Sequence, residues 1–73
     1  MTSDDLRTWQ DQMGYTYDTA AQALGVSRAT YADWVAGRSR TTGKPVAPSR
    51  AVGLACAALA AGLGEWNFSQ EPP

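Results

Sequence analysis

The hydrophobic pattern of the chain is helical, and its first helical segment opens the sequence. Leu6, Trp9 and Met13 recur at spacings that place them on one face of a helix. Ser3 is predicted to cap the start of this helix, and Gly14 is predicted to end it. Segments that alternate apolar and polar residues are nearly absent, so the pattern predicts an all-α protein.

Two further short helices are predicted on either side of Gly25. The earlier one is capped by Thr16 and ends at Gly25, and the later one is capped by Ser27 and closes at Gly37. The residues of the earlier helix that are expected to face inward are Ala20, Ala21 and Leu24. A short turn containing glycine, with Val26 filling the corner, is the layout of a helix-turn-helix.

A fourth helix is predicted from Pro48, which suits a first helical turn, to about Leu63. It has two apolar stripes, and a monomer of four short helices cannot cover both. The larger stripe, expected to pack inward, is Val52, Cys56, Leu59 and Leu63. The small stripe, expected to form the interface of a homodimer, is Ala51, Ala55, Ala58 and Gly62. Either face can be the inward one, and Trp66 or Phe68 folding back is an alternative cover for the outer one.

The length of 73 residues fits one domain, expected at residues 1–66 with a frayed tail at 67–73. A chain this short buries only roughly 60% of its unfolded surface, so its stability is marginal. Cys56 is the single cysteine, expected to be a small buried residue, and no histidine is present. We therefore expect no disulfide, metal or cofactor, and stabilisation by a helical core, by association with a second copy, or by both.

Charged residues are unevenly distributed along the chain, although the net charge is only −1. Residues 1–18 carry four aspartates and one arginine, whereas residues 28–50 carry five cationic side chains and one aspartate. The tail adds two glutamates. A basic centre between acidic ends is typical of a surface that binds a polyanion, and a plain solvated surface is the alternative interpretation.

The third helix carries an unusual exposed side. Tyr31, Trp34 and Val35 fall together on a helical wheel and are expected to be buried. The opposite side, flanked by Arg28 and Thr30, consists of Ala29, Ala32, Asp33 and Ala36. Small residues there let the helix backbone approach a surface closely, and the DNA major groove, ~12 Å wide, admits such a helix. The alternative is an ordinary alanine-rich helix.

Residues 16–40, TYDTAAQALGVSRATYADWVAGRSR, resemble the helix-turn-helix of the Cro/C1 (XRE-like) repressor family. The residues that match the family pattern are Thr16, Ala21, Leu24, Gly25, Val26, Ser27, Gly37 and Arg38. The resemblance implies a compact, lambda-repressor-like domain of four to five helices that binds double-stranded DNA. The following segment, GKPVAPSRAVGLACAALAAGL, looks like the last helix of short phage-borne members, which include anti-CRISPR-associated (Aca) regulators.

The chain departs from the family pattern at several positions, since Tyr31 and Trp34 are larger than the usual aliphatic residues and the recognition face lacks Gln and Asn. Tyr17 stands where the family has a glutamine that binds a phosphate, and its hydroxyl can donate in the same way. Ala20 replaces a core leucine, and the large Tyr31 and Trp34 can fill the lost volume.

Roles in DNA binding follow from the chemistry of the side chains. Arg28 is expected to bond guanine O6 and N7, and Ala29 and Thr30 are expected to meet a thymine methyl. Asp33 either accepts a hydrogen bond from a cytosine amino group or holds an arginine. Phosphate contacts, with solvated side chains as the alternative, are expected from Tyr17, Ser27, Arg38, Arg40 and Lys44.

These features favour a sequence-specific transcriptional repressor that acts as a homodimer on an inverted repeat, and the resemblance implies autoregulation of a phage or anti-CRISPR operon. The alternative is a protein-interaction module on the same fold, such as an antitoxin or a phage inhibitor. An enzyme is not expected, because no nucleophile–base pair and no paired carboxylates can be assigned. The apolar run at 51–63 is too short to span a membrane, no signal peptide and no small-molecule ligand are evident, and a cytoplasmic location at the nucleoid is expected.

Overall fold

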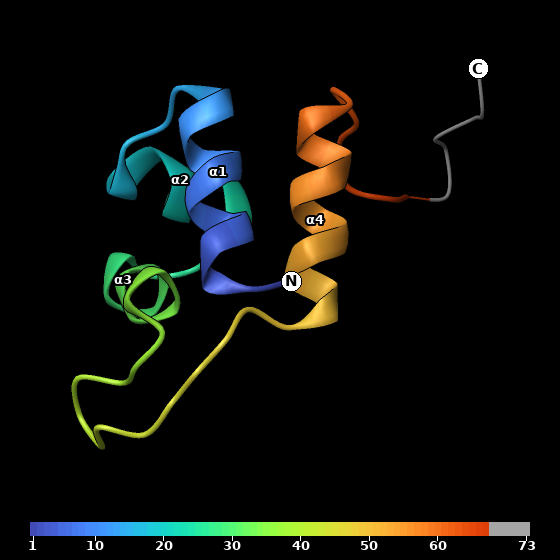
Figure 1. Cartoon of the computed structure of the whole chain (residues 1–73). Helices are drawn as coiled ribbons and strands as arrows, with labels where there is room; N and C mark the ends of the chain where they lie inside the picture. Colours follow the sequence, from blue (N-terminus) through green and yellow to red (C-terminus); the bar gives the residue numbers. More distant parts are fainter. Residues whose placement is uncertain (68–73) are drawn as a thin grey trace.

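The computed structural model describes residues 1–67, which form four α-helices. The helices are α1 (Ser3–Met13), α2 (Tyr17–Leu24), α3 (Arg28–Ala36) and α4 (Arg50–Ala60). Both α3 and α4 pack against α1 and α2, and they lie on opposite sides of the domain (Figure 1). The described residues contain no β-strand beyond an isolated bridge between Arg38 and Pro45. The all-α fold predicted from the sequence is confirmed.

The helix-turn-helix has the predicted caps. The side chains of Thr16 and Ser27 accept hydrogen bonds from the backbone N–H groups of Thr19 and Thr30, which begins α2 and α3 as predicted. Gly25 closes α2 with a φ of 74°, in the left-handed region that favours glycine. The turn between the two helices is therefore short, and the direction of α3 relative to α2 is fixed by local backbone chemistry.

The start of α1 differs from the prediction, because Thr2 and not Ser3 is its cap. The Thr2 side chain accepts a hydrogen bond from the Asp5 backbone N–H (3.0 Å), and the Asp5 carboxylate accepts one from the Thr2 backbone N–H (2.9 Å). This reciprocal capping box satisfies two donors at once, which a serine cap alone does not. These hydrogen bonds also lower the pKa of Asp5. Ser3 instead donates its hydroxyl to the backbone oxygen of Trp34 on α3 (2.6 Å).

The fourth helix is shorter than predicted at both ends. Pro48 is buried ahead of the helix, and Ser49 is the cap, since its hydroxyl accepts from the Val52 N–H (3.3 Å). The helix ends at Ala60, so Leu63 lies beyond it and is 52% exposed. The prediction that Leu63 extends the inward stripe was therefore wrong.

The core is built from all four helices. Its buried residues are Leu6, Trp9, Ala20, Ala21, Tyr31, Val35 and Cys56. Partly buried residues that pack against this core include Met13, Leu24, Trp34, Val52 and Leu59. These two sets match the inward faces predicted for each helix, apart from Leu63. Cys56 is a free thiol inside the core, as predicted for a small buried residue, and burial raises its pKa.

The segment after α4 does not return to the body of the domain through Trp66, which is 82% exposed. The alternative in which Trp66 covers the outer face of α4 was therefore wrong. Phe68, the other residue of that alternative, lies outside the described residues. None of the helices within residues 1–67 is long and apolar enough to cross a membrane.

Candidate nucleic-acid interface

The first turns of α2 and α3 meet on one surface. Asp18 lies in the first turn of α2, and its Oδ1 is 2.9 Å from Nε of Arg28, the first residue of α3. Beneath this ion pair, the rings of Tyr17 and Tyr31 pack edge to face, with centroids 5.6 Å apart. Each helix start presents unpaired backbone N–H groups and the positive end of a helix dipole, so their meeting favours an anionic ligand.

Arg28 projects into solvent from this surface but is held on two sides. Its side chain is 64% exposed, and its guanidinium carbon lies 5.5 Å from the centroid of the Tyr17 ring. A guanidinium over an aromatic face is attracted by the ring electrons. Arg28 is thus both accessible and restricted in orientation, which suits a residue that reads a base edge.

The predicted base-reading residues share the exposed side of α3 only in part. Ala29 and Thr30 are exposed. The Thr30 side chain accepts a hydrogen bond from the Ser27 hydroxyl (3.0 Å), so both hydroxyls take part in the cap of the helix. Ala32 is half-buried, whereas Ala36 is exposed. The accessible stretch of small residues is therefore concentrated in the first turn of α3, next to Arg28.

Asp33 binds an arginine of its own chain. Its side chain is only 23% exposed, and its Oδ1 lies 3.3 Å from Arg40 Nε. The same oxygen accepts from the Arg40 backbone N–H (3.4 Å), and the backbone oxygen of Asp33 accepts from the Arg38 N–H (3.2 Å). Asp33 therefore ties the segment after α3 to the helix, which is the second of the two roles that the sequence left open.

Residues 37–46, the cationic hairpin, form an ordered loop after α3. The backbone N–H of Ser39 donates to Lys44 O (2.9 Å), and that of Val46 donates to Gly37 O (3.1 Å). The cations of the hairpin, all exposed, are Arg38, Arg40 and Lys44. Within residues 1–67 the Lys44 ammonium makes no ion pair, so its charge is available to a ligand.

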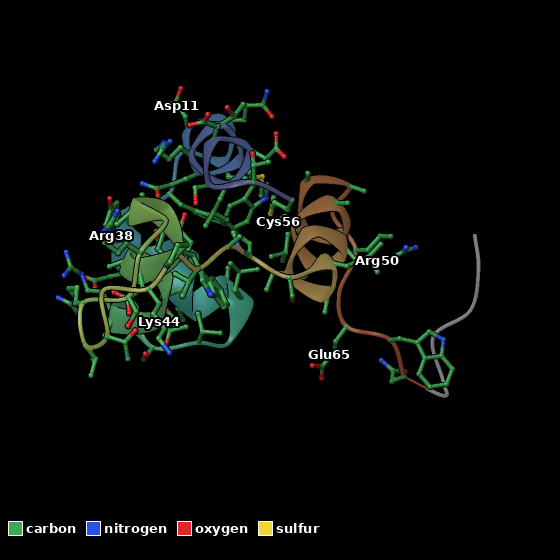
Figure 2. All side chains as sticks on the ribbon, turned by 60° about the horizontal axis from the view of Figure 1, so that its bottom comes forward. Asp11, Arg38, Lys44, Arg50, Cys56 and Glu65 are labelled. Carbon is green, nitrogen blue, oxygen red and sulfur yellow. The ribbon has the colours of Figure 1, made fainter. Side chains whose placement is uncertain are left out.

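Figure 2 shows Arg38 and Lys44 on the same side of the domain, whereas Arg50 extends from the opposite side, beside α4. Arg50 belongs to the basic centre of the sequence but not to the candidate interface. The basic centre is therefore divided in space between two sides of the molecule.

A clamp from α1 holds the end of α3, and sequence reasoning missed it. The Arg7 guanidinium donates to the backbone oxygen of Val35 (2.5 Å) and forms an ion pair with Asp4, while Ser3 binds Trp34 O. A cation at the last carbonyls of a helix complements its dipole. No local pattern indicates this contact, because it depends on the distance between helices that are far apart in sequence.

Tyr31 joins α3 to α1 from inside the core. It is fully buried, and its hydroxyl donates to Gln10 Oε1 (2.7 Å). Burial, with smaller effects of Cys56 and Tyr17, raises the pKa of Tyr31 to about 12. The aromatic platform under Arg28 is thus anchored by a buried hydrogen bond.

The residues predicted to form the dimer lie at different depths, and Gly62 lies beyond the end of α4, so the prediction that it extends the small stripe of the helix was wrong. Ala51 and Gly62 are exposed, whereas Ala55 and Ala58 are half-buried and line a shallow hollow against α2. Sequence reasoning missed Leu54, which is 60% exposed, although counting 100° per residue from Ala51 places it beside Ala58 and opposite the inward stripe. We call the exposed side that carries Leu54 and Ala51 the outer face of α4.

The fold is a helix-turn-helix domain of the DNA-binding class. Its defining features are the short glycine turn between two helices, the exposed arginine at the start of the second helix and the cationic hairpin after it. Residues 6–46 match the sequence model of the family described as Helix-turn-helix. Because the match covers more than half of the chain, the protein belongs to this family of DNA-binding regulators of the Cro/C1 (XRE) type. The resemblance inferred from residues 16–40 is thereby confirmed. No match was found among curated proteins or among solved structures.

Proposed function

We propose that this regulator is a sequence-specific transcriptional repressor that binds an inverted-repeat operator as a homodimer. The observation that carries the proposal is the meeting of the first turns of α2 and α3, with Arg28 accessible above it. The planar fork of Arg28 reads guanine, and Ala29 and Thr30 contact a thymine methyl in the major groove.

Phosphate contacts orient the domain on the duplex. Tyr17 and Ser27 lie at the starts of α2 and α3, where backbone N–H groups also point outward. On the other side of the groove, Arg38, Arg40 and Lys44 of the cationic hairpin bind the backbone. These contacts position the domain without distinguishing one sequence from another.

Dimerisation uses the outer face of α4. Of the residues predicted from the sequence, Ala51 is exposed on the same face as Leu54, Ala55 and Ala58 are half-buried, and Gly62 follows the end of the helix. A small domain with one free cysteine and no disulfide among its described residues gains stability from burying this surface. Since α3 and α4 lie on opposite sides of the domain, a two-fold pair through α4 separates the two recognition helices (Figure 1). We expect a separation of about 34 Å, one turn of duplex.

Repression follows from occupancy, since a dimer bound across a promoter excludes polymerase from the same duplex. The likeness of residues 43–63 to short phage-borne regulators makes the DNA upstream of its own gene the first operator to test. We expect a reporter driven by that DNA to fall when the protein is supplied.

Selection from a pool of random duplexes, followed by sequencing, tests the function. The expected result is an enriched palindrome whose half-sites lie about ten base pairs apart, bound by two protomers. Failure to enrich any sequence contradicts sequence-specific binding. Enrichment of a single half-site bound by one protomer contradicts the dimer but leaves base recognition intact.

A protein-interaction module is the second candidate, because Leu63 and Trp66 are 52% and 82% exposed after the end of α4. Exposed apolar residues of this size favour contact with another protein. This candidate is favoured if the folded protein enriches no sequence in the duplex selection.

A further inference from the structure

We infer that Asp18 is a specificity-determining residue: it positions Arg28 for base recognition and weakens the attraction of that arginine for phosphate. This role rests on the proposed function, since it concerns the arginine that reads bases there. Asp18 itself contacts no base and acts through Arg28.

The geometry around Arg28 leaves it little orientational freedom. Asp18 Oδ1 holds Nε at 2.9 Å, and the Tyr17 ring lies under the guanidinium. The Tyr17 ring is in turn fixed by the edge of Tyr31, which is fully buried and hydrogen-bonded to Gln10. The orientation of the exposed guanidinium is thus determined by a chain of contacts that ends in the core.

The ion pair uses one edge of the guanidinium and leaves the other free. Nε is bound by Asp18, whereas Nη1 and Nη2 make no hydrogen bond or ion pair with other residues in the range 1–67. These two nitrogens form the end-on fork, whose parallel donors match guanine O6 and N7. Asp18 therefore occupies the Nε edge of the Arg28 guanidinium and leaves the Nη1–Nη2 edge, which reads a base, free.

The charge of Asp18 also discriminates between ligands. Its side chain is 78% exposed beside Arg28, so it repels any anion that approaches the arginine. A phosphate carries a full negative charge, whereas the edge of guanine carries only partial charges, so the carboxylate weakens phosphate binding more. Asp33 does not share this role, because it is mostly buried and bonded to the backbone of Arg40.

The experiment compares Asp18→Asn with the parent on two duplexes, one selected by the parent from a random pool and one of scrambled sequence. The amide keeps the size of the side chain and an acceptor oxygen but removes the charge. We expect affinity for the scrambled duplex to rise, and the ratio of specific to nonspecific affinity to fall about three- to fivefold. The salt dependence of nonspecific binding should steepen by about one unit, because Arg28 is no longer neutralised.

Asp11→Asn is the matched control, because Asp11 is exposed and projects from α1 away from Arg38 and Lys44 (Figure 2). It removes the same charge from a residue that makes no ion pair with Arg28, so both the ratio of affinities and the salt dependence should stay near those of the parent. A second arm places Asp18→Asn in an Arg28→Ala background, where its effect on the ratio should vanish. A ratio that changes equally with and without Arg28 overturns the inference.

A readout without DNA separates the failure of this inference from failure of the proposed function. In the free protein, the motion of the Arg28 side chain, measured by NMR relaxation at Nε, should be restricted by the ion pair and should increase in Asp18→Ala. A parent that prefers its selected duplex, combined with an Asp18→Asn variant indistinguishable from Asp11→Asn, overturns the role of Asp18 alone. A parent with no preference between the duplexes overturns the proposed function, whatever the NMR result.

Discussion

The starts of α2 and α3 and the outer face of α4 are both exposed, but their side chains are held differently. At the helix starts, Arg28 is held by Asp18, and at the cationic hairpin Arg40 is held by Asp33. On the outer face of α4, Leu54 is 60% exposed among alanines. The first region is organised before it binds a ligand, which lowers the entropy cost of association. The second gains free energy only when a partner removes its apolar surface from water.

The largest effect is expected from Leu54→Glu, which places a charge in the outer face of α4. If that face forms the dimer, the variant should become monomeric and lose about 100-fold or more in affinity for a two-half-site operator, because the two binding events are no longer linked. Binding to a single half-site should be unchanged. Analytical ultracentrifugation and titrations on both duplexes measure the effect.

Ala60→Glu, at an exposed position on another side of α4, is the control and should stay dimeric. A parent that sediments as a monomer at micromolar concentration and binds one subunit per site contradicts the assignment of α4. The assignment is also contradicted if Leu54→Glu and Ala60→Glu have the same oligomeric state and the same operator affinity.

Arg28→Ala tests the other region and should cost about 1–3 kcal/mol in operator binding, with relaxed preference at one base pair in each half-site. Arg50→Ala removes the same charge on the far side of the domain and should preserve the preference (Figure 2). Competition with duplexes that vary one base pair at a time gives the readout. Equal affinity of Arg28→Ala and the parent for every sequence excludes a reading role.

Tyr31→Phe sharpens the comparison by loosening the core beneath Arg28. Loss of the hydrogen bond to Gln10 should destabilise the fold by about 1 kcal/mol. That loss lowers the melting temperature by roughly 4–8 °C for a domain of this size. A thermal scan followed by circular dichroism at neutral pH measures it, and an unchanged melting temperature means the bond adds no net stability.

The stability of the parent and of Tyr31→Phe should depend differently on pH in the alkaline range. The pKa of Tyr31 is raised from 10.0 to about 12 in the fold, so folding favours its neutral form. The resulting stability is fully present below pH 10 and is lost as pH rises towards 12. The melting temperature of the parent should therefore fall more steeply than that of Tyr31→Phe over this interval, and parallel curves contradict the assignment.

The smallest effects are expected from Arg38→Ala and Arg40→Ala in the cationic hairpin. Each should weaken binding to operator and to scrambled duplex alike, and should flatten the salt dependence by about one unit. Titrations over a range of salt concentrations provide the slopes. Slopes that do not change in either variant mean that these arginines face solvent in the complex.

Local chemistry explains which parts of this fold were predictable. Thr16, Gly25 and Ser27 act within one turn of their own position, so the sequence predicts their caps and turn correctly. The misplaced cap of α1 is instructive, since Thr2 prevails over Ser3 only because Asp5 reciprocates its hydrogen bond. Where two neighbouring residues can both cap a helix, the residue three positions later decides.

The contacts that shape the candidate site were not predictable in the same way. Arg7 reaches Val35 across two helices, and Asp18 reaches Arg28 across the turn. Each depends on interhelical distance and on the rotamer of a long side chain, which hydrophobic periodicity does not encode. The family resemblance indicated the candidate DNA-binding face, but not that Asp18 on the same face pairs with its arginine.

The small exposed residues of α3 also have a consequence for how such regulators diverge. Ala29 and Ala36 lie outside the core, while Tyr31 and Val35 on the same helix hold the fold together. Exchanging either alanine for a longer polar side chain therefore changes an exposed position of the helix without opening a cavity. Exposed and core positions alternate along this one short helix. If Ala29 meets the DNA as proposed, a single change there gives the regulator a new operator while the domain remains folded.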